Sequence, residues 1–328
     1  MAPAVPHVSV MRDELIAHLA PKPGGTYVDL TTGAGGHLEA ILQASSPDGH
    51  CIGIDRDHNA LEIARARLAR FEGRFTLIHG NAQDVVILIA RTLGRRHTPV
   101  HGVILDVGVS SMQLDQPSRG FSFRQGGPLD MRMDQSQGQT AADIVNGTNE
   151  ADLARLIDEF GEERYARRVA AAIVSRRSER LFRTTDDLAE VIARAIPSGN
   201  DSRGARGLSR AIHPATRTFQ AIRIAVNGEM DALRAAIPAA ISLTAPGGRV
   251  AVIAFHSLED RIVKQAFGRA SGKCTCPHGL PVCVCGAVAS VRILTPRPLV
   301  PSDTEIAANP RSRSARLRAV EVLRPLAP

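Results

Sequence analysis

The segment Asp29-Leu-Thr-Thr-Gly-Ala-Gly-Gly-His37 decides the fold of this 328-residue chain. It contains the end of the apolar run Thr26-Tyr-Val-Asp-Leu30, which is typical of a buried strand, and it precedes a helical pattern that begins at Leu38. Glycines at such a junction let the backbone turn tightly and approach a ligand. A strand, a glycine-rich loop and a helix in this order predict a nucleotide-type cofactor at the end of the first strand.

Strands and helices alternate on the C-terminal side of this loop. A helical pattern covers Ala60–Phe71, and apolar runs predict further strands over Cys51–Asp55, Phe75–His79, Gly102–Asp106 and Gly248–Phe255. Strands separated by helix-length segments favour right-handed βαβ units. The sequence therefore predicts an α/β fold, a Rossmann-like doubly wound sheet.

The alternation stops after the fourth predicted strand. The next stretch, to about Gly138, is rich in Gly, Pro, Ser and Arg, and consecutive helices are then expected over Glu150–Phe160, Glu163–Arg177 and Thr185–Ala195. One further helix is expected over Thr218–Leu243, before the last predicted strand. We therefore predict a sheet domain formed by residues 1–112 and 218–328, with a mostly helical insert at 113–217.

Composition and charge indicate where the protein acts and what it binds. Hydrophobic residues make up 44% of the chain, which is ordinary for a globular protein, and no apolar run reaches the roughly 18 residues of a membrane span. The N-terminus lacks a secretory pattern, so a cytoplasmic protein without membrane contact is expected. The net charge of +7 favours a polyanionic partner, although a high arginine content can also follow from genomic base composition.

Two carboxylates favour one cofactor over another. Asp55 ends the second predicted strand, where an acid can accept hydrogen bonds from both ribose hydroxyls of an adenosine. A nicotinamide dinucleotide is the alternative, but the third glycine of its fingerprint would fall on Leu38. A pyrophosphate has no need of an acid at Asp29, whereas the ammonium group of a methionine moiety does. The pattern therefore favours S-adenosylmethionine.

Asp106 begins the segment that follows the fourth strand. Methyl transfer to an exocyclic amine requires a hydrogen-bond acceptor that holds the nitrogen in line with the methyl group, so Asp106 is the candidate catalytic residue. It can instead bind the cofactor or cap its own loop. Methylation of a ring carbon usually needs a cysteine nucleophile, and the sequence has none between His79 and Gly272. A nitrogen or oxygen acceptor is therefore favoured.

Longer motifs resemble the bacterial 16S ribosomal RNA cytosine-N4 methyltransferases, the MraW or RsmH family. Together with the glycine loop they run in order from about His7 to Arg318, and they comprise Asp106-Val-Gly-Val-Ser-Ser-Met-Gln-Leu-Asp115, Arg119-Gly-Phe-Ser-Phe123, Gly127-Pro-Leu-Asp-Met-Arg-Met-Asp134, Gly161-Glu-Glu-Arg164, His213-Pro-Ala-Thr-Arg-Thr-Phe-Gln220, Phe255-His-Ser-Leu-Glu-Asp-Arg261 and Asn309-Pro-Arg-Ser-Arg313. The resemblance implies a Rossmann-like methyltransferase with a helical substrate-recognition insert. Its implied partners are S-adenosylmethionine and 16S ribosomal RNA of the small ribosomal subunit.

The resemblance also implies a target and a set of contacts. The methyl acceptor would be N4 of a decoding-centre cytosine, at the conventional position 1402. Cofactor contacts carry over to Gly35, Gly36, His37, Asp55, Ala82, Asp106 and Gln113. The family usually has Phe where this chain has Ala82, so only a backbone contact is expected there. Two alternatives share parts of this pattern. One is a nucleic-acid-binding protein without catalysis. The other is a DNA amino-methyltransferase, but those enzymes usually have a Pro-Pro-aromatic motif that the segment Asp106-Val-Gly-Val does not contain.

Several arginines and aromatic residues are candidate RNA contacts. Arg119, Phe121 and Phe123 interleave guanidinium groups with rings on which splayed bases can stack, unless the phenylalanines anchor the loop in the core. Phosphate contacts are expected from arginines with few acids nearby, namely Arg210, Arg217, Arg223 and the run from Arg311 and Arg313 to Arg318. His256 and Ser257 follow the last predicted strand and are expected near the site.

Four of the five cysteines form a cluster, Cys274-Thr-Cys276 and Cys283-Val-Cys285. In a reducing compartment such a cluster suggests a metal rather than disulfides. Cys-x-Cys is tighter than the usual zinc spacing, so a zinc site and a redox-sensitive loop of thiols both remain open.

Overall fold

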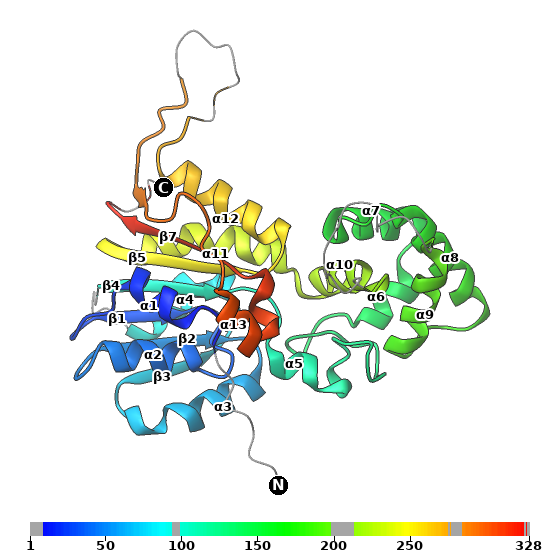
Figure 1. The fold of residues 1–328 in the computed structure, drawn as a ribbon, viewed down its shortest axis with the longest axis horizontal. Helices are drawn as coiled ribbons and strands as arrows, with labels where there is room; N and C mark the ends of the chain where they lie inside the picture. Colours follow the sequence, from blue (N-terminus) through cyan, green and yellow to red (C-terminus); the bar gives the residue numbers. More distant parts are fainter. Residues whose placement is uncertain are drawn as a thin grey trace. The chain divides into compact units, whose positions relative to one another are not determined.

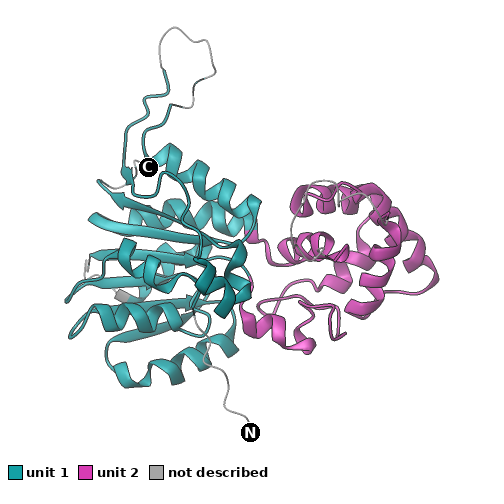
Figure 2. Cartoon of the chain, in the orientation of Figure 1, with its two compact units in different colours: residues 1–108, 230–328 teal, residues 109–229 magenta. Residues whose placement is uncertain are grey.

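The computed structural model describes residues 9–93, 99–197, 213–274, 276, 284–324 and 326, and it divides into two compact units. Unit 1 comprises residues 1–108 and 230–328, and unit 2 comprises residues 109–229 (Figure 2). The α/β sheet with a mostly helical insert is confirmed. Unit 2 begins at Val109 and ends at Glu229, whereas we predicted an insert at 113–217. Among the described residues, no helix has the length and apolar character required to cross a membrane.

Unit 1 is built on a seven-stranded sheet with the order β3-β2-β1-β4-β5-β7-β6 (Figure 1). The first five strands are parallel, β7 is antiparallel to β5, and β6 is antiparallel to β7. In chain order the strands are β1 Thr26–Asp29, β2 His50–Asp55, β3 Phe75–His79, β4 Val100–Asp106, β5 Thr244–Ala254, β6 Val291–Ile293 and β7 Arg316–Val322. The helices of this unit are α1 Arg12–Leu19, α2 Gly36–Ala44, α3 His58–Leu68, α4 Val85–Leu93, α11 Glu229–Leu243 (which starts at the last residue of unit 2), α12 Ser257–Ala270 and α13 Asp303–Ala308, with short 3-10 turns at 69–71, 82–84 and 310–314.

Both faces of the sheet are covered by apolar side chains. Because successive side chains of a strand point to opposite faces, Val28 packs in one core cluster with residues of α11 and α12, and Tyr27 packs in the other with residues of α1 and α2. Strands buried on both faces read as continuous apolar runs, which is why β1, β2, β4 and β5 were predicted from sequence. Strand β3 is a half-buried edge strand, but its run Phe75–His79 was apolar enough to be predicted as well.

The edge formed by β7 and β6 was not predicted. Strand β7 alternates charged and apolar residues, and its Arg318 is 8% exposed. The Arg318 guanidinium donates to both carboxylate oxygens of Asp260 in α12, at 2.6 and 3.1 Å, and Arg316 donates to the same carboxylate at 3.2 Å. These arginines hold the pKa of Asp260 below its usual range, although burial opposes the shift. The buried ion pair argues against Arg318 as a phosphate contact, whereas Arg316 remains exposed and its phosphate contact stays a prediction.

Unit 2 is helical around its own core. Its elements are α5 Ser111–Asp115, a 3-10 turn at 117–119, α6 Ala141–Gly147, α7 Glu150–Gly161, α8 Ala166–Glu179, α9 Thr185–Ala195 and α10 Ala215–Asn227. Leu153, Ile157, Ile173 and Phe182 are among the side chains fully buried in that core.

The single helix predicted over Thr218–Leu243 is wrong, because the structure has two helices there. Helix α10 ends at Asn227, and Gly228 adopts φ +58°, the left-handed conformation that closes many helices. The Gly228 N–H donates to the carbonyl of Ile224, and α11 then begins at Glu229. Apolar residues keep a helical spacing on both sides of Gly228, so the spacing alone did not reveal that one helix ends there.

Candidate cofactor site

Three acids lie at the carboxyl ends of adjacent strands. Asp29, Asp55 and Asp106 end β1, β2 and β4, which are neighbours in the order β2-β1-β4. Thr31 joins two of these ends, because its Oγ1 accepts a hydrogen bond from the Asp106 N–H at 2.6 Å. Ligands of doubly wound sheets bind at this edge, so the three carboxylates line the place where a cofactor is expected.

The glycine loop is held close to its neighbours. Gly35 has φ +78°, and a Cβ atom there would lie 3.1 Å from the Cβ of Ala64 in α3. A Cβ atom on Gly36 would lie 2.0 Å from Ser9 Oγ. Helix α2 begins at Gly36, and its N-cap residue Gly35 has no side chain with which to cap the helix. The first N–H groups of α2 therefore suit an anionic ligand group such as a carboxylate.

Asp55 is positioned by two backbone donors. Its Oδ2 accepts from the Gly33 N–H at 2.7 Å, and its Oδ1 accepts from the Asp57 N–H at 2.9 Å. Burial raises the pKa of Asp55, although these two hydrogen bonds oppose the shift. Each carboxylate oxygen keeps a lone pair for a further donor, such as a ribose hydroxyl.

Buried polar atoms without hydrogen bonds gather around His37. Asp29 is fully buried, and its Oδ1 accepts from the Thr31 N–H at 2.9 Å. Within the part of the chain that the structure describes, Asp29 Oδ2, both ring nitrogens of His37 and Asp106 Oδ1 have no hydrogen-bond partner. His37 Nε2 lies 3.4 Å from Asp106 Oδ2, within ion-pair distance but outside hydrogen-bond geometry. Buried polar atoms usually have hydrogen-bond partners, and a bound polar ligand would provide the partners that these atoms lack.

The electrostatics of this cluster fit a cationic ligand. Burial raises the pKa of Asp29 to about 7, with His37 opposing the shift and Asp106 adding to it. Burial alone would lower the pKa of His37, but the carboxylates of Asp106 and Asp29 outweigh it and raise that pKa. An ammonium group beside Asp29 would offset the cost of its buried charge and favour the ionised carboxylate.

A model of the MraW methylase family matches residues 4–323 of this sequence. The chain belongs to the MraW methylase family. It is 51% identical to the ribosomal RNA small subunit methyltransferase H of Geobacter sp. (strain M21), over 96% of this chain and 98% of that protein. The protein of the same name from Geobacter sulfurreducens is 53% identical over 97% and 99% of the two chains. The one from Symbiobacterium thermophilum is 50% identical over 96% of each.

The cofactor of this MraW methylase is S-adenosylmethionine, and the residues present fit it. Asp29 offers an unpartnered, buried carboxylate oxygen for an ammonium group, and Asp55 offers acceptors for ribose hydroxyls. Ala82 begins a 3-10 turn after β3 and packs, half-buried, against the sheet core. It provides no ring for an adenine.

Gln113, the remaining residue of the cofactor contacts that the resemblance implies, lies in unit 2. Gln113 is buried, its Oε1 accepts from the Ser110 N–H at 3.0 Å, and its own N–H donates to Ser110 Oγ at 3.2 Å. This reciprocal pair caps α5. The structure thus gives Gln113 a helix-capping role. The other implied contacts lie at or next to the strand ends of unit 1, namely Gly35, Gly36, His37, Asp55 and Asp106.

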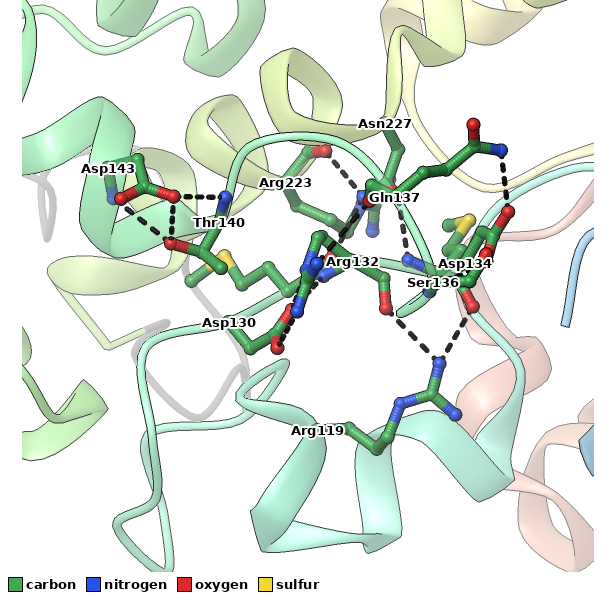
Figure 3. A network of polar contacts seen from close by, with 12 residues as sticks. Arg119, Asp130, Arg132, Asp134, Ser136, Gln137, Thr140, Asp143, Arg223 and Asn227 are labelled. Carbon is green, nitrogen blue, oxygen red and sulfur yellow. Dashed lines mark hydrogen bonds and ion pairs between the residues drawn. The ribbon is translucent and has the colours of Figure 1, made fainter.

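Arg119 is an internal cross-link of unit 2 (Figure 3). It is 4% exposed, and its Nη2 donates to the carbonyls of Arg132 and Met133 at 3.2 and 2.9 Å. Phe121 is 7% exposed, and Phe123 packs against His213 and Phe219 at centroid distances of 4.6 and 4.8 Å. This placement supports the alternative in which the rings anchor the loop, and it argues against Arg119 and Phe121 as RNA contacts.

The cross-link fixes a strained turn in the MraW motif Gly127–Asp134. Met131 is fully buried with φ +61°, an unusual conformation for a large side chain. Its N–H donates to the Arg119 carbonyl at 3.1 Å, and its carbonyl accepts from Asn227 Nδ2 at 2.8 Å. Asn227 Oδ1 also accepts from the Met133 N–H at 2.8 Å (Figure 3). Strain that several hydrogen bonds hold in place is typical of functional segments.

The arginines expected to contact phosphate fall into three groups. Arg223 makes two hydrogen bonds to the buried Glu229, at 2.8 and 2.9 Å, so this expectation for Arg223 is wrong. Arg217 is exposed on α10, and Arg311 and Arg313 are exposed on the 3-10 turn after α13. Arg210 lies outside the described residues.

Sequence reasoning placed His256 near the site but missed its partner Glu259. The Glu259 side chain is fully buried, and its Oε2 accepts from the Phe255 and His256 N–H groups at 2.7 and 3.2 Å. His256 Nε2 lies 2.9 Å from the other carboxylate oxygen. A Cβ atom on Gly108 would lie 3.9 Å from that oxygen, so the pair adjoins the segment after Asp106. The spacing His-Ser-Leu-Glu resembles a capping box, and this pattern could have identified Glu259 as the partner of His256.

Proposed function

We propose that this chain transfers a methyl group from S-adenosylmethionine to the exocyclic N4 of a cytosine in 16S ribosomal RNA, the decoding-centre cytosine that the family resemblance implies. The observation that carries the proposal is the cluster of Asp29, His37 and Asp106 at the strand ends, with its unpartnered buried atoms. The relatives named small subunit methyltransferase H supply the class of substrate. Such a substrate is found in the cytoplasm.

The cofactor-binding roles follow from the residues. Asp29 would hold the ammonium group, Asp55 the ribose hydroxyls, and the N-terminus of α2 at Gly36 the carboxylate. When bound, S-adenosylmethionine supplies an electrophilic methyl group on a sulfonium. The remaining work of the protein is to place the amine nitrogen in line with that group.

Asp106 is the residue proposed to orient the amine. Its Oδ1 is buried without a hydrogen bond, so it can accept one from the amine and direct the nitrogen lone pair. The other oxygen, Oδ2, lies 3.4 Å from His37 Nε2, so the histidine ring adjoins that side of the carboxylate and leaves Oδ1 for the amine. As the N–C bond forms and the S–C bond breaks, the amine loses one proton, which leaves to solvent.

The test uses purified protein, labelled S-adenosylmethionine and small ribosomal subunits from a strain that lacks the modification. We expect N4-methylcytidine in the digested RNA, detected by nucleoside mass spectrometry. Parallel reactions with free 16S RNA and with duplex DNA distinguish the substrate classes. A methyl group found on carbon, or on DNA alone, would contradict the proposal. Cofactor binding without any transfer would instead favour a nucleic-acid-binding protein that has lost catalysis.

Arg311 and Arg313 are proposed as phosphate contacts because both are exposed on one short turn. Replacing both with Gln should weaken RNA binding and reduce the magnitude of the slope of log affinity against log salt by about 1.4 to 1.8, since each contact contributes roughly 0.7 to 0.9. Binding measured by fluorescence anisotropy over a salt series checks this. The control is Arg65→Gln, an exposed arginine of α3 that pairs with Glu62. An unchanged slope in the double variant would exclude this turn from the RNA interface.

A further inference from the structure

The segment between α12 and β6, which Figure 1 shows in orange, carries three of the cysteines that the structure describes. The Sγ atoms of Cys274, Cys276 and Cys285 all lie within 4.8 Å of one another, and those of Cys274 and Cys285 are 3.7 Å apart. All three are thiols in this structure. A disulfide would require about 2.05 Å between sulfurs. Two thiolates on one tetrahedral zinc ion lie about 3.8 Å apart, because each Zn–S bond is about 2.3 Å.

We propose that Cys274, Cys276 and Cys285 bind a structural zinc ion. Thiolates are the ligands that zinc prefers in structural sites, and binding releases the thiol protons to solvent. The Cys276 N–H lies 3.4 Å from Cys274 Sγ, where it donates to the sulfur and stabilises negative charge on it. The proposal rests on these three described thiols. His278 and Cys283 also occur in this part of the sequence but lie outside the described residues.

The segment has a hydrogen-bonded base but little apolar packing beyond it. At the base, the Ser290 N–H donates to the Ala270 carbonyl at 2.7 Å, and the Lys273 N–H donates to the Gly268 carbonyl at 3.1 Å. Farther out, Val284 and Val288 are 77% and 57% exposed. The described side chains of this segment bury little apolar surface, so a metal cross-link would be what holds its conformation, and Cys274 directly follows this base.

The position of the thiols separates them from the proposed chemistry. His256 and Glu259, which adjoin the segment after Asp106, lie at the start of α12, and the cysteines follow its end. Helix α12 has 14 residues, so it spans about 21 Å. We therefore assign the metal a structural role, and loss of the metal should change the rate of methyl transfer by no more than about twofold.

The first measurement is the metal content of the full-length chain, expressed with added zinc and purified without chelator. We expect about one equivalent of zinc, with X-ray absorption showing sulfur ligands at about 2.3 Å. The double variant Cys274→Ser/Cys285→Ser should retain less than about a tenth of an equivalent. The control is Cys51→Ala, which changes a buried β2 cysteine whose thiol pKa is raised by burial, and it should retain the zinc.

A further readout keeps the test independent of folding defects in the variants. Removal of zinc from the wild-type protein by a chelator should speed tryptic cleavage after Lys273, which directly precedes Cys274, and restored zinc should slow it again. Wild-type protein with less than about a tenth of an equivalent would overturn the proposal. A double variant that keeps its zinc would also overturn it, as would a disulfide between Cys274 and Cys285 in the metal-supplemented protein.

Discussion

Asp106→Asn should lower the rate of methyl transfer by about 100- to 1000-fold while the RNA still binds. The Asn amide replaces one carboxylate oxygen by a donor and leaves the other as a neutral, weaker acceptor, so the cytosine amine meets either a donor or a weaker acceptor where the carboxylate oriented its lone pair. The substitution also removes the charge 3.4 Å from His37, which lowers the pKa of that histidine. Single-turnover transfer at saturating cofactor and RNA measures the effect, with cofactor affinity measured separately by calorimetry.

The matched control is Asp231→Asn, which makes the same change on an exposed acid of α11 that pairs with Arg234. This control should transfer methyl groups at the wild-type rate. If Asp106→Asn also transfers at the wild-type rate, Asp106 is not the orienting acceptor. If its rate is normal at saturation and only cofactor affinity falls, Asp106 acts as a cofactor ligand instead.

Asp29→Asn should weaken S-adenosylmethionine binding at pH 8 by about 10- to 100-fold, the range expected when one charged, buried hydrogen-bond acceptor is lost. In the wild-type protein, the raised pKa of about 7 means that Asp29 carries its charge only above that pH, while Asp55, Asp106 and His37 complete the charged surroundings. Wild-type affinity should therefore rise as pH increases from 6 to 8. The variant should lose most of this dependence, and calorimetry at several pH values compares the two proteins.

The stability of the cofactor-free protein should fall as pH rises, whereas cofactor affinity should rise. A carboxyl whose folded-state pKa is raised to about 7 contributes stability when protonated, and this contribution is lost as pH rises from about 4 through 7. The loss at pH 8 is at most about 4 kcal/mol. Asp29→Asn should therefore raise the melting temperature of the cofactor-free protein at pH 8 and change it little at pH 5. A variant that melts lower at pH 8 would contradict the charge argument.

The parts of the fold that could be predicted from sequence are those that depend on burial alone. Strands β1, β2, β4 and β5 are apolar because both of their faces are covered, and β3 is a half-buried edge strand that is still apolar. Strand β7 escaped prediction because Arg316 and Arg318 read as solvent-exposed charges, while their partner Asp260 lies more than fifty residues earlier in the chain. An ion pair between distant segments leaves no local pattern.

Some residues of the site could be predicted from sequence, and others could not, because only some of them leave a local pattern. Asp29, His37, Asp55 and Asp106 were found because strand ends meet at one edge of a parallel sheet. Arg119 was assigned to RNA because its neighbours are aromatic, but its guanidinium donates to backbone carbonyls of the Met131 turn. Main-chain acceptors carry no residue-type signature, so nothing in the sequence marked this arginine as internal.

The nested order of the two units has a consequence for synthesis on the ribosome. Unit 2 is one continuous stretch with its own core, so every residue it needs has been translated by Glu229. The sheet of unit 1 is complete only when β7, at Arg316–Val322, is inserted between β5 and β6, almost at the end of the chain. Because compact units fold as wholes and earlier segments emerge first, unit 2 should reach its native state while β1 to β4 still await their later partners. During that interval the nascent chain exposes the unpaired side of β4, which makes these strands the part most dependent on chaperones during translation.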